Sequence, residues 1–336
     1  MKLIVQIPCF NEAEQLPATL QDLPREVPGI DKVEWLIIDD GSTDATVEVA
    51  RRHGVDHIVR LTNHKGLAEA FQAGLDACLK LGADVIVNTD ADNQYQAAAI
   101  PELVRPVLAG QADLVIGDRN IETIAHFSRS KKRLQRLGSS VVRSVSHTTV
   151  PDVTSGFRAY NREAALQVQV VSKFTYTIET IIQAGKMLVS VDHVPVGTNP
   201  QVRASRLFSS TWSYVRRNAV AIFRIYTMYE PLRVFLVAAA VAAAIGSVIW
   251  IRFLYYFFSE GGRGHVQSLI LGATMLVIAV QLAALGVMAD VLAAIRVLLQ
   301  RTLERVRRVE LELGVTPSHY EPGESPVSAR DSDPES

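Results

Sequence analysis

The residues best suited to chemistry lie in the stretch NTDADNQYQ, residues 88–96. An apolar run ends there in Asp90 and Asp92, one residue apart, and the amide of Gln94 follows two residues later. On an extended chain these three side chains would point the same way. Mg²⁺ and Mn²⁺ prefer such oxygen ligands and keep coordination places for substrate phosphates. The stretch therefore predicts a divalent-cation site, with a solvated turn as the alternative.

A second candidate site follows another apolar run, which ends in Asp39 and Asp40. A carboxylate at this position can accept hydrogen bonds from the base or the ribose of a nucleoside. Ser42 or Thr43 can also cap the helix that we expect to begin near residue 44. Gly66 opens a further predicted helix, where free backbone N–H groups can face a phosphate. Together these features favour a nucleotide pocket.

A cluster of cations lies in SRSKKRLQRLGS, with helical spacing between Lys131, Lys132, Arg133 and Arg136. A lipid phosphate is already an anion at neutral pH, because its second pKa is about 6. It needs no strong general base to act as a nucleophile, only cations that hold it. The cluster predicts a site for an anionic acceptor, or else a face that contacts anionic lipid headgroups.

Short apolar runs alternate with amphipathic stretches over the first 200 residues, which predicts an α/β domain with a mostly parallel sheet. In such sheets ligands bind beyond the carboxyl ends of the strands, where the motifs lie. The expected strands are 2–8, 33–40, 57–61, 84–90 and 113–119, and the expected helices are 13–23, 44–54, 66–82 and 98–110.

Two long apolar runs, 234–251 and 266–289, carry no charged side chain. As helices with their apolar flanks, both can cross a hydrocarbon core of roughly 30 Å. The short loop SEGGRGH joins them, so we expect a hairpin whose flanks lie on one side of a membrane. Arginines cluster in both flanks, whereas the loop has only Arg263. The positive-inside rule then places both flanks in the cytoplasm.

The composition and the order of these segments suggest four regions and no nucleic-acid partner. The 336 residues include 34 basic and 35 acidic side chains, so the bulk charge indicates no nucleic-acid partner. The regions that we expect are a catalytic domain at 1–206, interfacial amphipathic helices (or a packed linker) at 207–230, two transmembrane helices within 231–299 (about 234–256 and 266–289), and a basic helix end with a disordered cytoplasmic tail at 300–336.

Six motifs occur in one order along the chain: PCFNE, DDGSTDAT, NHKGLAEAFQAG, DADNQ, GDR and TSGFRA. With the hairpin that follows, they resemble family 2 of the inverting GT-A glycosyltransferases. Within it they resemble the polyprenyl-phosphate group, which contains dolichol-phosphate mannose synthase and the undecaprenyl-phosphate glucosyltransferases. The resemblance covers residues 1 to about 210 by motif and the rest by architecture. It implies a Rossmann-like GT-A domain followed by interfacial helices and the membrane hairpin.

The resemblance also implies a role for each matching residue. Asp90, Asp92 and Gln94 would hold the metal against a diphosphate, and Asp92 and Arg119 would be the catalytic pair. One departure is the segment TNPQVRASRLF, which lacks the glycine that the family often has after its arginine. Glu179, on a further expected helix, is either a polar active-site group or part of a solvated face. The implied substrate-binding residues are Pro8, Phe10, Glu12, Asp40, Asp90, Lys132, Arg133, Arg203 and Arg206.

The implied reaction is inverting, metal-dependent transfer of one sugar from a UDP- or GDP-sugar to polyprenyl phosphate, with Mg²⁺ or Mn²⁺, at the cytoplasmic face of the cell membrane. The protein would be a multi-pass membrane enzyme, and a homo-oligomer is left open. One alternative is transfer to another lipid or to a growing polysaccharide. A processive synthase would carry more membrane helices and a Q-x-x-R-W-type motif. The other alternative is a non-catalytic membrane scaffold, against which the intact acidic motif argues.

Overall fold

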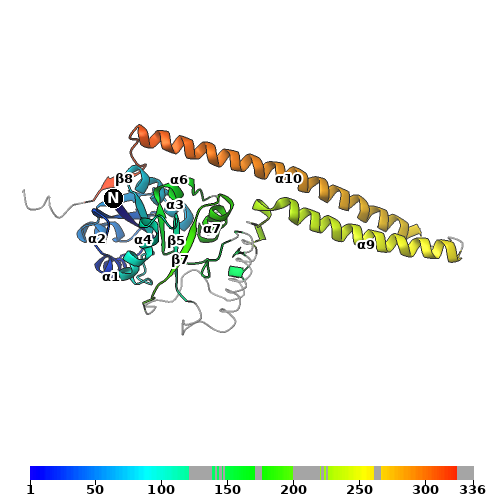
Figure 1. Ribbon diagram of the computed structural model, residues 1–336, viewed down its shortest axis with the longest axis horizontal. Coiled ribbons are helices and arrows are strands. Elements are labelled where there is room, and N and C mark those ends of the chain that lie inside the picture. Colours follow the sequence, from blue (N-terminus) through cyan, green and yellow to red (C-terminus); the bar gives the residue numbers. More distant parts are fainter. Residues whose placement is uncertain are drawn as a thin grey trace, which may run out of the picture. The chain divides into compact units, whose positions relative to one another are not determined.

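The computed structural model describes residues 1–120, 138–140, 142, 143, 146, 148–170, 176–199, 220, 223, 224, 226–260 and 266–323. The chain divides into two compact units. One unit combines Met1–Ile222 with Leu303–Ser336, and the other is Phe223–Thr302. The first contains the sheet and its covering helices, and the second contains long helices (Figure 1).

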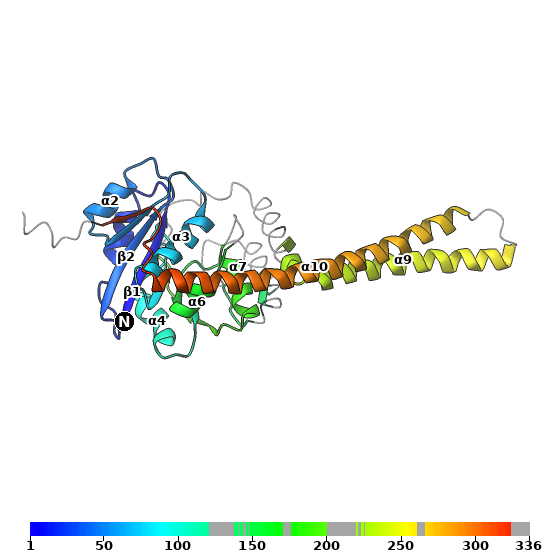
Figure 2. The ribbon, with the colours of Figure 1, turned by 90° about the horizontal axis from the view of Figure 1, so that it is seen from above.

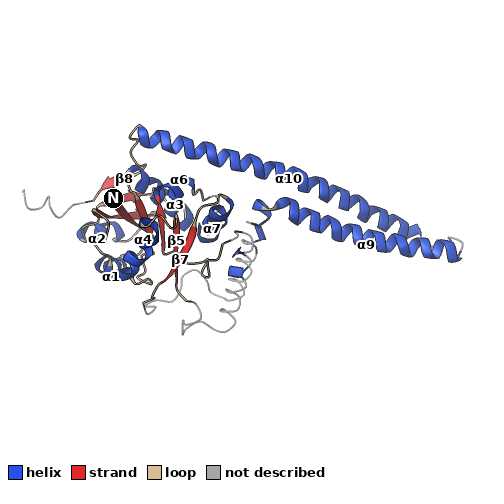
Figure 3. Ribbon diagram, viewed as in Figure 1, coloured by secondary structure: helices blue, strands red, loops and turns tan. Residues whose placement is uncertain are grey.

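A mostly parallel, eight-stranded sheet forms the centre of the first unit in the described part of the chain, in the order β7–β5–β6–β4–β1–β2–β3–β8 (Figure 3). The strands are β1 (Lys2–Cys9), β2 (Lys32–Asp39), β3 (His57–Arg60), β4 (Val85–Asn88), β5 (Leu114–Asp118), β6 (Arg158–Asn161), β7 (Val191–Pro195) and β8 (Tyr320–Pro322). Only β6 and β8 pair antiparallel to their neighbours among these strands. The five strands expected from apolar runs are confirmed. The other three are short and carry polar or charged residues, so they have no such signal.

Helices cover both faces of the sheet. On one face, Leu3, Val5 and Ile7 of β1 enter a buried apolar cluster with α1 (Leu16–Asp22), α2 (Thr46–Arg52) and α4 (Ile100–Leu108), which a 3₁₀ turn (Ala97–Ala99) precedes. The other face carries α3 (Leu67–Lys80), α6 (Arg162–Gln167) and α7 (Tyr176–Lys186). A Cβ on Gly74 of α3 would lie 2.4 Å from Oε1 of Gln6 in β1, so the helix and the strand approach closely. Burial of both faces explains the near-continuous apolar runs of the strands.

The carboxyl ends of three parallel strands meet at one edge of the sheet. Cys9 at the end of β1 pairs with Asp39 at the end of β2. Asn88 at the end of β4 pairs with Gln6 of β1. The motifs PCFNE, DDGSTD and DADNQ follow these ends directly, so the sheet brings them to one edge.

The second unit is built on two helices that lie side by side in both views, α9 (Pro231–Glu260) and the first part of α10 (Val266–Glu312) (Figures 1 and 2). Both are long and apolar enough to cross a membrane, and only 17% of the most apolar window of each is buried. Their contact uses small residues, since a Cβ on Gly246 would lie 3.1 Å from the carbonyl oxygen of Gly272. The helix expected at 266–289 is longer than predicted, and most of the expected interfacial region, 207–230, lies outside the described residues.

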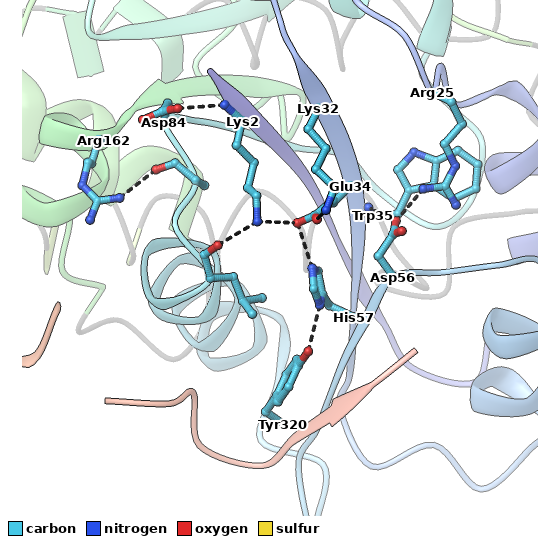
Figure 4. A network of polar contacts seen from close by, with 12 residues as sticks. Lys2, Arg25, Lys32, Glu34, Trp35, Asp56, His57, Asp84, Arg162 and Tyr320 are labelled. Atoms are coloured by element: carbon cyan, nitrogen blue, oxygen red, sulfur yellow. Dashed lines mark hydrogen bonds and ion pairs between the residues drawn. The ribbon is translucent and has the colours of Figure 1, made fainter. Parts of the chain in front are cut away.

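The expectation of a disordered tail after the basic helix end is wrong for Tyr320–Pro322, which form β8, and residues 324–336 lie outside the described residues. Tyr320 lies in β8, and its hydroxyl is 3.0 Å from Nδ1 of His57 in β3 (Figure 4). His57 Nε2 lies 2.9 Å from Oε2 of Glu34, which also pairs with Lys2 and Lys32. Burial would raise the pKa of Glu34, but hydrogen bonds from His57, Lys32 and Lys2 outweigh it and hold that pKa well below its ordinary value. The C-terminal strand is therefore joined to the sheet by backbone pairing and by this polar network.

Candidate active site

The acidic motif after β4 forms a turn. β4 ends at Asn88, Asn93 adopts a left-handed conformation (φ 53°), and the backbone N–H of Gln94 donates to Oδ1 of Asp92 at 3.1 Å. The chain is therefore not extended from Asp90 to Gln94, and the shared direction expected of an extended chain does not apply to these side chains. An aspartate that accepts the N–H two residues later stabilises such a turn. Asp92 remains exposed to solvent.

Asp90 has a carboxylate that accepts no hydrogen bond from the described residues. Burial and then the charge of Asp92 raise the pKa of Asp90 to about 7, against the opposing effect of Arg119 and Arg158. Two neighbouring carboxylates, one of them partly buried and without a donor, form an arrangement that a bound cation would stabilise.

Gly156 of the TSGFRA motif shapes the space around Asp90. A Cβ at this position would lie 3.1 Å from both oxygens of Asp90 and 2.8 Å from the hydroxyl of Tyr176. The Gly156 N–H donates to the Tyr95 hydroxyl at 2.9 Å, and its carbonyl oxygen accepts from Nδ2 of Asn88 at 2.8 Å. The glycine is held on both sides, so a larger residue could not move away from the carboxylate.

Arg119 lies in a buried, forked ion pair with Asp152. Its Nε donates to Oδ2 of Asp152 at 2.6 Å and its Nη2 to Oδ1 at 3.0 Å, and Nη2 also donates to the Thr154 hydroxyl at 2.8 Å. The Arg119 and Asp152 side chains are 9% and 0% exposed. Removing one partner of such a pair costs about 3–5 kcal/mol. Sequence reasoning missed Asp152, because a single aspartate in a polar segment carries no pattern.

Asp40 organises the neighbouring loop from within. Its Oδ1 accepts the N–H of Lys65 at 2.7 Å, and its Oδ2 accepts the N–H of Gly66 at 2.8 Å. The N–H of Gly66 itself is therefore not available to a phosphate, whereas Gly66 does open the helix α3 as expected. Oδ2 also lies 2.8 Å from Nδ1 of His64, whose ring stacks on Phe10 with centroids 3.9 Å apart. Asp40 thus fixes an exposed aromatic pair at the end of β1.

Asp39, unlike Asp40, has a carboxylate oxygen that accepts no hydrogen bond among the described residues. Its side chain is fully buried, and its Oδ1 accepts the N–H of Ser42 at 3.0 Å. Its Oδ2 has no hydrogen-bond partner among the described residues, and Nε of Arg60 lies 3.6 Å away. A buried polar atom without a partner costs about 1–3 kcal/mol, which a ligand that donates to it would offset. The motif contained Asp39, but its pattern could not separate the two aspartates.

The remaining predicted contacts fall in two groups. Pro8 is buried in β1 opposite Ile38 of β2, and Glu12 lies just beyond β1, where its backbone N–H donates to the Thr46 hydroxyl at 3.0 Å. Both lie at the strand edge that carries Phe10. The cationic positions Lys131, Lys132, Arg133, Arg136, Arg203 and Arg206 lie outside the described residues.

Glu179 lies on a helix as expected, in α7, but it is only 1% exposed. The alternative of a solvated helix face is therefore wrong. Nε2 of Gln183 donates to its Oε1 at 3.4 Å. Glu179 belongs to the buried side of α7, the helix whose first residue is Tyr176.

The acidic site has the chemistry of a shared metal site. In the described part of the chain, no three His, Cys, Asp or Glu side chains are grouped to hold a metal ion. Asp90 and Asp92 supply two carboxylates, and Gln94 has an amide oxygen on the same turn. Mg²⁺ is commonly held by one or two carboxylates together with substrate phosphates. These residues therefore fit an ion that binds together with a phosphate ligand.

Known proteins match the chain over this same unit. The profile of glycosyl transferase family 2 matches residues 4–168. Undecaprenyl-phosphate mannosyltransferase of Micrococcus luteus is 30% identical over 206 residues, which are 58% of this chain and 83% of that protein. Polyprenol monophosphomannose synthase of Mycolicibacterium smegmatis is 31% identical over 206 residues, which are 58% of this chain and 76% of that protein.

Solved structures share the fold. Glucosyl-3-phosphoglycerate synthase from Mycobacterium tuberculosis, in complex with Mn²⁺, UDP-glucose and phosphoglyceric acid, superposes with a TM-score of 0.52 at 21% identity. The match covers 67% of this chain and 79% of that one.

Proposed function

We propose a reaction for this chain from the premise that it belongs to glycosyl transferase family 2 and is a glycosyltransferase with the GT-A fold. In this proposal it transfers one sugar from a nucleotide-sugar to polyprenyl phosphate. The names of the two relatives support this acceptor, and they make mannose the first sugar to test. The donor would be a UDP- or GDP-sugar.

The observation that carries the proposal is the Asp90 carboxylate. It lies at the carboxyl end of β4, beside the exposed Asp92, with no hydrogen-bond donor among the described residues. We assign Asp90, Asp92 and Gln94 to a divalent cation, Mg²⁺ or Mn²⁺. When bound, such a cation would neutralise charge on the diphosphate leaving group.

The donor nucleoside is assigned to the edge formed by β1 and β2. Pro8 and Glu12 would line the pocket, and Phe10 would offer an exposed aromatic face. Asp39 is the better nucleoside acceptor, since its buried Oδ2 has no donor within the described chain. Asp40 would support this pocket indirectly, by holding the loop that carries His64 against Phe10.

The acceptor phosphate is assigned to the cations that follow β5. Two nitrogens of Arg119 already donate to Asp152, so Arg119 would act mainly by holding the 152–158 loop beside Asp90 and by lending charge to the site. Lys132 and Arg133 would hold the lipid phosphate. Arg203 and Arg206 would contact the diphosphate.

The reaction is a single displacement. An oxygen of the lipid phosphate, already an anion, forms a bond to the anomeric carbon while the bond from that carbon to the diphosphate oxygen breaks. The electron pair of the broken bond leaves with the nucleoside diphosphate, and the anomeric configuration inverts. The protein side chains hold nucleophile, carbon and leaving group in line, which supplies much of the acceleration.

The two helices α9 and α10 are proposed to form a membrane hairpin. The segments before and after it, Met1–Ile222 and Leu303–Ser336, belong to one compact unit. Because a folded unit lies on one side of a membrane, both ends of the hairpin share that side, and the flanking arginines favour the cytoplasm. The catalytic domain would span 1–206, with the interfacial region at 207–230.

The experiment that tests the proposal presents the purified protein with polyprenyl phosphate and labelled nucleotide-sugars, beginning with GDP-mannose and UDP-glucose and continuing with other UDP- and GDP-sugars. Extraction then separates labelled lipid from labelled nucleotide-sugar. The proposal expects one sugar per lipid, with chelator and Asp92→Asn each abolishing transfer. Label that stays in the aqueous phase for every donor, or transfer that survives chelator, would show that the proposed reaction is wrong.

A further inference from the structure

The segment that follows the hairpin, Leu303–Gly323, is part of the same compact unit as the sheet. We call it the return segment. Its far end pairs with the sheet as β8 (Figure 4). Its near end is the last part of α10, which contacts α6 and the residues after it through Arg307 and Arg308. The return segment is thus attached to the catalytic unit at two separate places.

Arg307 makes the more specific of the near-end contacts. Its Nη1 donates to the carbonyl oxygens of Leu166 and Val168 at 3.1 and 3.0 Å, and its Nη2 donates to Oε1 of Gln169 at 2.6 Å. Leu166 lies in the last turn of α6, where carbonyl groups have no partner within the helix. One guanidinium therefore completes the C-terminus of α6 and holds the next residues in place.

The residues held by Arg307 are also held by α7 and α3. The Gln169 N–H donates to Oε1 of Gln183 in α7 at 3.0 Å, and Nε2 of Gln183 donates back to the carbonyl oxygen of Gln169. Gln183 is 1% exposed. The N–H of Val170 donates to Oε1 of Gln72 in α3 at 2.8 Å. The segment 166–170 therefore joins the return segment to α7 through directional hydrogen bonds.

The first turn of α7 borders the Asp90 site. The Tyr176 hydroxyl accepts from Nδ2 of Asn88 at 3.0 Å, next to the Gly156 position that lies against Asp90. The buried Arg158 donates to the carbonyl oxygens of Thr177 and Val153, at 2.9 and 3.0 Å. These bonds tie α7 to the loop that carries Gly156. A shift of α7 would therefore move one wall of the site.

We infer that Arg307 is a positioning residue for the transfer reaction: it couples the return segment to α7 and so fixes the wall of the Asp90 site. The inference rests on the proposed function. The donor nucleoside is assigned to the β1–β2 edge, whereas the first turn of α7 bonds to Asn88 at the end of β4, so loss of Arg307 acts on turnover more than on donor binding. Misplacement of a reacting group by about 1 Å can lower the rate up to a hundredfold.

The test compares Arg307→Ala and Arg307→Lys with Arg308→Ala in the full-length protein. Arg308 is a matched control one position along, because it pairs with Glu163 and Glu304 and its side chain is 41% exposed. The readouts are kcat, the donor KM and hydrogen exchange of the α7 amides.

Chemical rescue provides a second test. Arg307 lines a cavity of about 320 Å³ with Gln72 and Asp76, so a small cation can reach the place that the Arg307 guanidinium leaves in Arg307→Ala. Guanidinium at a non-denaturing concentration is therefore added, with NaCl of equal ionic strength as its reference.

For Arg307→Ala we expect kcat to fall roughly tenfold, with a donor KM within about twofold of wild type and faster exchange in α7. Guanidinium should restore both kcat and protection, Arg307→Lys should be intermediate, and Arg308→Ala should match wild type. Equal kcat in Arg307→Ala and Arg308→Ala would overturn the inference. So would a loss of kcat that follows global melting and does not respond to guanidinium. If the wild type transfers no sugar, the proposed function fails and the catalytic part of the inference fails with it; α7 exchange and its recovery by guanidinium then decide only whether Arg307 couples the return segment to α7.

Discussion

Replacing Asp90 with asparagine should stabilise the metal-free protein while abolishing transfer. The Asp90 carboxylate has no hydrogen-bond donor in the described part of the chain, and it lies beside Asp92. Asparagine has nearly the same shape but carries no charge to desolvate. On the proposed function, the wild-type acid would serve ligand binding at the expense of stability.

The magnitude follows from the raised pKa of Asp90, which moves from 3.8 to about 7. Each unit corresponds to 1.36 kcal/mol, so a shift of about three units sets an upper bound of ~4 kcal/mol above pH 7. Solvent reaches part of the side chain, so we expect about 1–2 kcal/mol. The folded protein binds this proton more tightly than the unfolded chain. The contribution of Asp90 to the free energy of unfolding therefore falls as the pH rises from about 4 to about 7.

The assay measures the melting temperature of the purified full-length protein in chelator, at about pH 8 and about pH 5. Asp90→Asn should melt above wild type at the higher pH, and the difference should shrink at the lower pH, where the wild-type Asp90 is protonated. Mn²⁺ should raise the melting temperature of wild type but not of the variant. Asp92→Asn is the comparison variant: the charge of Asp92 is the smaller of the two causes that raise the pKa of Asp90, so this change should stabilise the protein less than Asp90→Asn does.

Two results would refute this reasoning. One is a variant that melts at or below the wild-type temperature at the higher pH. The other is a stabilisation that is equal at both pH values, because the ionised carboxylate would then not be its cause.

Three further predictions concern the donor, the acceptor and the membrane. Asp39→Asn should weaken donor binding roughly tenfold in calorimetry, because the amide replaces an acceptor by a donor; unchanged affinity would exclude a nucleoside contact. Lys132→Ala with Arg133→Ala should lower acceptor efficiency roughly tenfold or more while donor binding persists, since a charge-assisted hydrogen bond contributes about 1.5–3 kcal/mol; unchanged dependence on polyprenyl phosphate would reassign these two cations to headgroup contact. A cysteine at Gly262 should label from the side opposite to a cysteine in the C-terminal tail, with little background because both native cysteines are buried; labelling from the same side would exclude the hairpin.

The local pattern of the chain determined the elements that position the site. Runs such as KLIVQIP and VEWLIID are apolar because both faces of their strands are buried, so they could be read without knowledge of their partners. The apolar parts of α9 and α10 follow from apolar length alone, whereas the continuation of α10 to Glu312 does not. The position of the acidic motif directly after a buried strand could be predicted for the same reason. β8 could not be predicted, because a three-residue polar strand is held by its pairing with β3 and by His57.

Only the tertiary structure decided which polar groups have hydrogen-bond partners within the described chain and which do not. Asp39 and Asp40 are equivalent in the sequence, but a loop distant in the chain donates to both oxygens of Asp40. Among the described residues only the nearby Ser42 donates to Asp39, and to one oxygen. Arg119 is paired with an aspartate 33 positions away, which no local spacing indicates. Hydrogen bonds and burial depend on groups brought together by folding, whereas strand and helix patterns depend on neighbours along the chain. The sequence therefore predicted that the polar motifs come to one edge of the sheet, and the packing of loops determined which hydrogen bonds each side chain makes there.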